Sequence, residues 1–126
     1  ISPEIARKMV QEVLAAVVSM GTGRPAQIPG YAVFGKTGTA QVARSDGRGY
    51  KPHAYVGTFL GGAPAPAPRL VAMVSVTEPD ARKGYYGGTV AAPSVKRILE
   101  AALKYYAIPP VDDEQPLESI PIQVFD

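Results

Sequence analysis

A lysine, two threonines and a glycine stand at consecutive positions in one segment, and their spacing is the first chemical feature of the chain. Apolar side chains alternate with a period of two over residues 32–41, as is typical of a β-strand, so Lys36 is expected on one face and Thr37 and Thr39 on the other. Gly38 stands between the two hydroxyls. A glycine weakens a strand and adds nothing to its packing. It therefore usually marks a position where a ligand or another backbone comes close.

The same residues match a phosphate-binding pattern, but their surroundings do not fit it. Gly30 to Thr37 follows G-x-x-x-x-G-K-[ST], in which backbone N–H groups and the lysine bind phosphates. Such a loop follows a strand and has a helix beginning at its lysine. Here residues 27–30 precede the motif, Gly38 follows soon after Lys36, and the four internal residues are apolar and strand-like. These surroundings therefore argue against the nucleotide-binding interpretation.

The other interpretation takes Lys36-Thr37-Gly38 as the K-T-G motif of serine acyl-transfer enzymes that bind penicillin or D-Ala-D-Ala peptides. The motif comes with neighbours in the order and spacing of one family: Gly21-Thr22-Gly23, Gly30-Tyr31, Gly35 to Gln41, Phe59 with Gly61, Ala63-Pro64, Glu78-Pro79, Gly87-Gly88 and Ala91-Ala92-Pro93. From about Ile1 to Pro110 the chain resembles the C-terminal part of the transpeptidase domain of class B penicillin-binding proteins. These are peptidoglycan D,D-transpeptidases of cell division or elongation.

The resemblance implies a role for each residue of the motif. Lys36 would supply a positive charge that stabilises the proton transfers and the substrate carboxylate. The hydroxyls of Thr37 and Thr39 would donate hydrogen bonds to the same carboxylate. The backbone N–H of Thr39 would be one of two oxyanion-hole donors. Gly38 would leave the strand edge bare for the acyl group. Taken singly, the lysine also suits a solvated strand, the threonines suit any strand, and the glycine suits a bulge.

Two further pairs of residues lie in the loop before the second helix. In the resemblance Tyr85 and Tyr86 lie near the rim of the cleft, although packing or loop closure is the simpler interpretation for both. Gly87 and Gly88 are expected to serve backbone geometry rather than substrate binding.

Two amphipathic helices flank the strands that must hold this segment. The first begins at Ser2, which suits the capping position, with Pro3 at the first helical position and Glu4 in the first turn. Its apolar stripe predicts a helix that faces the core: Ile5, Met9, Val10, Val13, Leu14 and Val17. The second begins near Thr89, with Pro93 in its first turn. Its stripe comprises Val95, Ile98, Leu99, Ala102, Leu103 and Tyr106.

Three antiparallel strands are expected between the helices. The strand 32–41 reverses through a polar hairpin at residues 46–49 and returns as residues 54–60. A proline-rich turn then leads to residues 70–76, whose unbroken apolar run predicts a central strand buried on both faces. With both helices laid on one face of the sheet, the fold class is α+β. The resemblance makes this part of a β-lactamase/transpeptidase-like fold.

Within this sheet, Lys36 to Thr39 are expected at an edge. They would pair with residues 54–60 on one side and leave the other side free to receive substrate. Residues 1–108 are interpreted as the transpeptidase portion, and residues 109–126 as an acidic, proline-containing surface tail.

Charge and composition exclude several other functions. All thirteen lysines and arginines precede residue 107, but they are scattered over helices and loops without a one-sided basic stripe, so no nucleic-acid partner is expected. The absence of cysteine and the single His53 argue against a thiolate or histidine metal site, and no cofactor is expected. No run approaches the ~20 apolar residues of a membrane span. The resemblance implies an envelope enzyme anchored in the cytoplasmic membrane by other residues, with its catalytic domain on the outer face.

Two motifs of the family are missing from these residues. None of the six serines, Ser2, Ser19, Ser45, Ser75, Ser94 and Ser119, has a lysine three residues later, and the chain has no asparagine. Neither S-x-x-K nor S-x-N is therefore present, and the chain is expected to supply only the K-T-G wall of the active site.

Three functions remain open. The first is a peptidoglycan transpeptidase acting by acyl-serine chemistry, whose partners would be D-Ala-D-Ala stem peptides, β-lactams and the remainder of the same domain. The second is a β-lactamase or D,D-carboxypeptidase. The third is a non-enzymatic penicillin sensor or cell-wall binding module.

Overall fold

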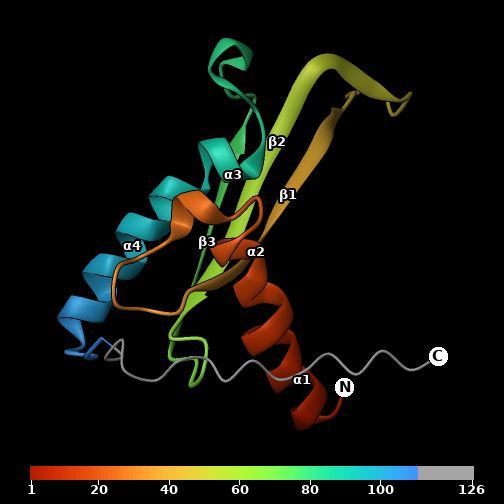
Figure 1. Ribbon diagram of the computed structural model, residues 1–126. Helices are drawn as coiled ribbons and strands as arrows, with labels where there is room; N and C mark the ends of the chain where they lie inside the picture. The colour runs from red at the N-terminus through yellow and green to blue at the C-terminus, as the bar shows by residue number, and fades with distance from the viewer. Residues whose placement is uncertain (111–126) are drawn as a thin grey trace.

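A computed structural model describes residues 1–110. It contains one three-stranded antiparallel sheet, with helices before and after the three strands in the sequence (Figure 1). The elements follow the order α1 (Pro3–Lys8), η1 (Met9–Leu14), α2 (Ala15–Ser19), η2 (Arg24–Ala26), β1 (Phe34–Ala43), β2 (Tyr50–Ala63), β3 (Leu70–Thr77), η3 (Ala81–Lys83), α3 (Gly87–Val90) and α4 (Ala92–Tyr105). The predicted α+β class is confirmed. The predicted tail lies outside the described residues from position 111 onward.

The motif strand and its hairpin form as predicted, although β1 begins at Phe34 and the burial along it does not alternate strictly. The sheet order is β1-β2-β3, and in the β1–β2 pair Lys36 stands opposite Leu60 and Thr39 opposite Gly57. The hairpin turns at Gly47 and Gly49, whose φ values of 71° and 80° lie in the left-handed region that glycine adopts without steric cost. β2 begins at Tyr50, which is earlier than predicted, so β1 and β2 extend as a two-stranded ribbon beyond β3 (Figure 1).

The prediction of a central strand at residues 70–76 is wrong. β3 pairs only with β2 in the described sheet, and its residues alternate between half-buried and exposed. Ala72, Val74 and Val76 pack against the core, whereas Val71 and Met73 are each 63% exposed on the opposite face. The apolar run reflects two apolar faces, but the described residues cover only one of them.

The N-terminal helix begins as predicted, but its apolar stripe is not buried. Oγ of Ser2 accepts a hydrogen bond from the backbone N–H of Ile5 at 3.3 Å. Helical structure continues through the π-helical segment η1 to Ser19. The prediction of a core-facing helix is wrong for most of its length, because Ile5, Met9 and Val13 are 53%, 42% and 50% exposed. Val18, near the C-terminal end, is the buried residue of this helix.

The C-terminal helix forms most of the core with the sheet. Val95, Leu99 and Leu103 are buried on α4 and cluster with the fully buried Phe59 of β2. Ile98 and Tyr106 belong to the predicted stripe but are 48% and 61% exposed.

The two helices contact different parts of the sheet. α4 lies along β2 and β3, while η1 and α2 contact β1, and η2 lies between α2 and α4 and contacts both. Val18 of α2 and Val95 of α4 belong to the same core cluster as Phe59 of β2, so both helices meet the sheet at one core, as expected, whereas α1 extends away from the sheet (Figure 1). Within the described residues, no helix combines the length and the apolar character that a membrane crossing requires.

Candidate active site at the free edge of β1

The K-T-G segment lies on an outer strand of the described sheet. β1 pairs with β2 on one side and has no strand on its other side among the described residues. This confirms the predicted geometry of Lys36 to Thr39, which are paired with the returning strand and have one edge unpaired. Such an edge carries backbone N–H and C=O groups that can receive an extended peptide.

Lys36 reaches around this edge to the neighbouring residue. Its Nζ donates to the carbonyl oxygen of Thr37 at 2.7 Å and to Oγ1 of Thr37 at 3.4 Å. We infer that the Thr37 carbonyl points toward the free edge, because its partner Nζ belongs to a side chain and not to β2. Backbone groups of residues two apart in a strand point the same way, so the N–H of Thr39 points toward the free edge as well.

A pocket of about 310 Å³ lies beside the two threonines. Its lining residues are Thr22, Pro25, Thr37, Thr39, Tyr86, Gly88 and Thr89. Threonine hydroxyls supply hydrogen-bond donors and acceptors without charge, and the ammonium group of Lys36 bonds to Thr37 at the pocket wall. The arrangement suits a small anionic group such as a carboxylate.

The two predicted rim tyrosines take different positions. Tyr86 lines the pocket with Thr37 and Thr39. Tyr85 instead stacks on Tyr55 of β2, with ring centroids 4.1 Å apart, and its hydroxyl donates to that of Tyr86 at 3.2 Å. This hydrogen bond is the main reason that the pKa of Tyr85 is raised above its ordinary value. Tyr85 thus ties the loop to β2, and Tyr86 contributes to the pocket.

The glycines of the site serve different purposes. A Cβ at Gly87 would collide with the carbonyl of Thr58, and one at Gly88 with the carbonyl of Thr22. Both glycines therefore allow close backbone approach, as predicted, although Gly88 also lines the pocket. A Cβ at Gly38 would meet only the Thr58 side chain, at 3.7 Å, so packing within the described residues does not require glycine there.

Sequence reasoning missed several residues of the pocket. Thr22 lies 15 residues before Thr37, yet their Oγ1 atoms are 3.1 Å apart. Pro25 and Thr89 also line the pocket. The only signal for Thr22 was its position between two glycines in a segment shared with the family, and that signal did not distinguish a turn from a site.

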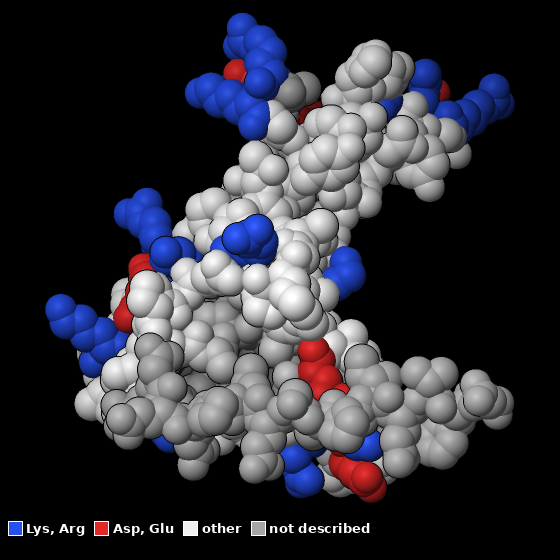
Figure 2. Space-filling model, in the orientation of Figure 1, with Lys and Arg blue, Asp and Glu red and all other residues white. Residues whose placement is uncertain are grey.

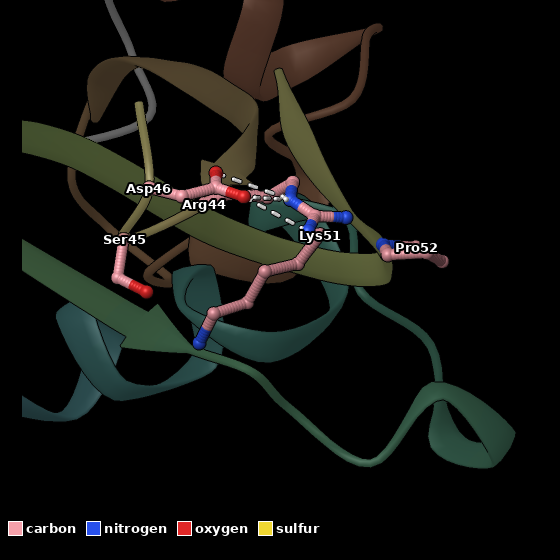
Figure 3. Close-up of a pocket in the computed structure, with 5 residues that line it drawn as sticks. All are labelled: Arg44, Ser45, Asp46, Lys51 and Pro52. Atoms are coloured by element: carbon pink, nitrogen blue, oxygen red, sulfur yellow. Dashed lines mark hydrogen bonds and ion pairs between the residues drawn. The ribbon is translucent and has the colours of Figure 1, made fainter. Parts of the chain in front are cut away.

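A second hollow, of about 180 Å³, lies at the tip of the hairpin (Figure 3). It is lined by Arg44, Ser45, Asp46, Lys51 and Pro52. Arg44 pairs with Asp46 at 3.0 Å, and this contact lowers the pKa of the Asp46 carboxyl. Both side chains are about half exposed. We therefore interpret the hollow as a surface feature formed around this ion pair, and not as a binding site.

Charged side chains on the face in view lie in separate groups (Figure 2). Lysines and arginines cap the two projections at the top of the view, and no continuous basic stripe joins them there. Among the described residues, no cluster of His, Cys, Asp and Glu is suited to hold a metal ion.

Comparison with known proteins defines the class of this chain. The sequence model of the penicillin binding protein transpeptidase domain matches residues 1–100. The chain therefore belongs to the penicillin-binding protein transpeptidase family.

Curated relatives of the chain include proteins named peptidoglycan D,D-transpeptidases. It is 44% identical over 109 residues to the probable peptidoglycan D,D-transpeptidase PbpC of Pseudomonas aeruginosa, covering 86% of this chain and 19% of that protein. It is 37% identical over 106 residues to the peptidoglycan D,D-transpeptidase FtsI of Escherichia coli, covering 84% of this chain and 18% of that protein. The chain thus spans about a fifth of the length of these relatives.

Solved structures show the same fold. The transpeptidase domain of penicillin-binding protein 3 from Burkholderia pseudomallei superimposes with a TM-score of 0.74 at 41% identity, covering 91% of this chain and 33% of that one. Penicillin-binding protein 3 from Mycobacterium tuberculosis in complex with ampicillin gives a TM-score of 0.77 at 33% identity, covering 92% and 27%. The sheet and helices described here therefore form part of a β-lactamase-like transpeptidase fold.

Proposed function

We propose that this chain forms the K-T-G wall of a serine-type peptidoglycan D,D-transpeptidase. The observation that carries the proposal is the cluster of Lys36, Thr37 and Thr39 at the unpaired edge of β1 beside a pocket. The names of the curated relatives support the same reaction class.

The proposed substrate is a stem peptide ending in D-Ala-D-Ala, and β-lactams would bind as its mimics. The peptide carboxylate would accept hydrogen bonds from the hydroxyls of Thr37 and Thr39, with the charge of Lys36 close by. Gly38 would let the peptide backbone lie along the strand edge, because it places no side chain there. These contacts would hold the scissile amide against β1 and exclude other orientations.

The chemical step needs a nucleophile that these residues do not supply. A serine from elsewhere in the domain would attack the penultimate D-Ala carbonyl, form an acyl ester and release D-Ala, which takes up a proton as its amine leaves. The amine of a second stem peptide would then attack the ester and return the proton to the serine. Lys36 would steady the proton transfers by its positive charge.

The backbone of Thr39 has a separate proposed role. As each tetrahedral intermediate forms, negative charge develops on the carbonyl oxygen. The Thr39 N–H, which we infer points to the free edge, would be one of the two donors that bind this oxygen. Removing a donor of this kind typically costs about 3 kcal/mol of barrier stabilisation.

The proposed setting is the bacterial cell envelope, with a membrane anchor outside these residues and the catalytic domain on the outer face of the cytoplasmic membrane. Its partners would be stem peptides and the rest of the same transpeptidase domain. The carboxypeptidase, β-lactamase and sensor alternatives draw no specific support from the site.

The test uses the full-length protein that carries this segment, a donor peptide ending in D-Ala-D-Ala and a second peptide with a free amine. Mass spectrometry is expected to find a cross-linked product together with released D-Ala. Release of D-Ala with only the hydrolysed donor would indicate a carboxypeptidase, and no release at all would indicate a binding module.

A further inference from the structure

Thr22 contributes a pocket hydroxyl that the proposed reaction does not yet use. Its Oγ1 lies 3.1 Å from Oγ1 of Thr37, and both side chains line the same pocket. The contact joins the loop after α2 to the K-T-G strand. The position of one hydroxyl therefore affects the position of the other.

The backbone around Thr22 is fixed from two sides. The N–H groups of Gly21 and Gly23 both donate to the carbonyl of Val17, at 3.2 and 2.9 Å. On the other side, α3 approaches so closely that a Cβ at Gly88 would collide with the carbonyl of Thr22. Thr22 thus lies between the end of the first helix and the start of α3, and its hydroxyl is held against β1.

The number of protons and lone pairs then limits the hydrogen-bond pattern. A threonine hydroxyl has one proton to donate and two lone pairs, whereas an ammonium group can only donate. Lys36 Nζ lies 3.4 Å from Oγ1 of Thr37 and donates to it. If Thr22 also donates to Thr37, both lone pairs of Thr37 are used and its proton remains available to an anion in the pocket. In the opposite sense Thr37 would donate to Thr22 and have no proton for the ligand.

We propose that Thr22 is a positioning residue that donates to Thr37 and thereby orients the Thr37 hydroxyl toward the substrate carboxylate. The inference rests on the proposed function and adds to it a residue from outside the K-T-G strand. Thr22 acts through Thr37 and does not contact the reacting atoms.

The test is a double-mutant cycle in the full-length protein, read as the second-order rate of acylation by a fluorescent penicillin. Thr22→Val is expected to lower this rate roughly three- to tenfold, the range for a lost neutral hydrogen bond. Thr22→Ser keeps the hydroxyl and is expected to stay within about twofold of the parent. In a Thr37→Val background, Thr22→Val is expected to add less than about a twofold change, because a residue that acts through Thr37 has nothing left to orient.

Ser19→Ala is the matched control. It removes an exposed hydroxyl whose contact is the local carbonyl of Ala16 at 3.5 Å, and it is expected to leave the rate unchanged. Thr22→Ala replaces the valine variant if thermal unfolding shows that Thr22→Val does not fold. Failure of both to fold would make Thr22 purely structural and overturn the inference.

The remaining outcomes separate the two claims. A parent protein that is not acylated at all would overturn the proposed function. A parent that is acylated, with a rate that Thr22→Val does not change, would overturn the role of Thr22 alone. The role of Thr22 would also be overturned if Thr22→Val lowered the acylation rate by the same factor in the parent and in the Thr37→Val background.

Discussion

Nζ of Lys36 lies 2.7 Å from the carbonyl oxygen of Thr37, although the two side chains leave β1 on opposite faces. The contact is possible because β1 is an outer strand of the described sheet, so the lysine side chain can pass around its unpaired edge. It brings a positive charge to the side of the strand where the threonines line a pocket. Charge and hydroxyls therefore meet at the edge of the strand.

Thr39→Val in the full-length protein is expected to slow acylation by penicillin roughly tenfold or more. The change would remove the proposed hydrogen bond to the substrate carboxylate, worth ~1.5–3 kcal/mol, while it keeps the shape and strand propensity of the side chain. Stopped-flow acylation kinetics measure the effect, and a thermal melt checks that the fold survives. A rate equal to that of the parent would mean that Thr39 only fills the strand.

Gly87→Ala is expected to destabilise the full-length protein by about 3 kcal/mol or more, because its methyl group would overlap backbone that cannot move aside. That backbone is the carbonyl of Thr58 on β2. Gly38→Ala is the matched comparison, since a Cβ there would meet only a side chain at 3.7 Å. Its effect on stability is expected to stay within about 1 kcal/mol. Denaturant unfolding measures the free energy of unfolding of both variants. Equal values for the two would contradict the described packing of α3 on the sheet.

Tyr85→Ala is expected to loosen the loop that carries Tyr86 more than Tyr86→Ala does. Tyr85 stacks on Tyr55 and bonds to Tyr86, whereas the Tyr86 side chain is 59% exposed. Hydrogen exchange of the loop 78–88 measures the difference. Equal protection in the two variants would show that the stack does not hold the loop.

The isolated chain is expected to associate and to form no covalent penicillin adduct. No serine in the sequence has a lysine three positions later, so none has the activating partner that the family uses. Leu60, Val71 and Met73 are 40%, 63% and 63% exposed on one face of the sheet. An apolar face of this kind promotes association in water, and we expect the rest of the domain to cover it.

Sedimentation in dilute solution and intact mass after incubation with penicillin check these two expectations. Val71→Lys together with Met73→Glu should shift the sedimenting species toward a monomer. A compact monomer of the unaltered chain, or a stoichiometric serine adduct, would contradict the account.

Local pattern was sufficient for the strands and the hairpin, whereas the edge position of the motif was expected from the role that the family resemblance gives it. Period-two alternation and the Asp46-Gly47 turn are encoded within a few residues. Burial was harder to predict. The apolar run at 70–76 and the apolar stripe of the first helix show which side chains are apolar, but not which segment of the protein covers them. The Thr22–Thr37 contact depends on the path of the loop after α2, and nothing in residue spacing encodes that path.

The central claim is that Lys36 at the free edge of β1 acts on the bound substrate. The most direct measurement is the second-order rate of penicillin acylation of the full-length protein for Lys36→Ala, compared with Lys96→Ala. Lys96 lies on α4 and pairs with Glu100 at 3.9 Å, so its loss is expected to leave the rate unchanged. Lys36→Ala is expected to lower the rate at least about thirtyfold, as for loss of one partner of a hydrogen-bonded charge pair. Equal rates for the two variants would contradict the assignment of the site.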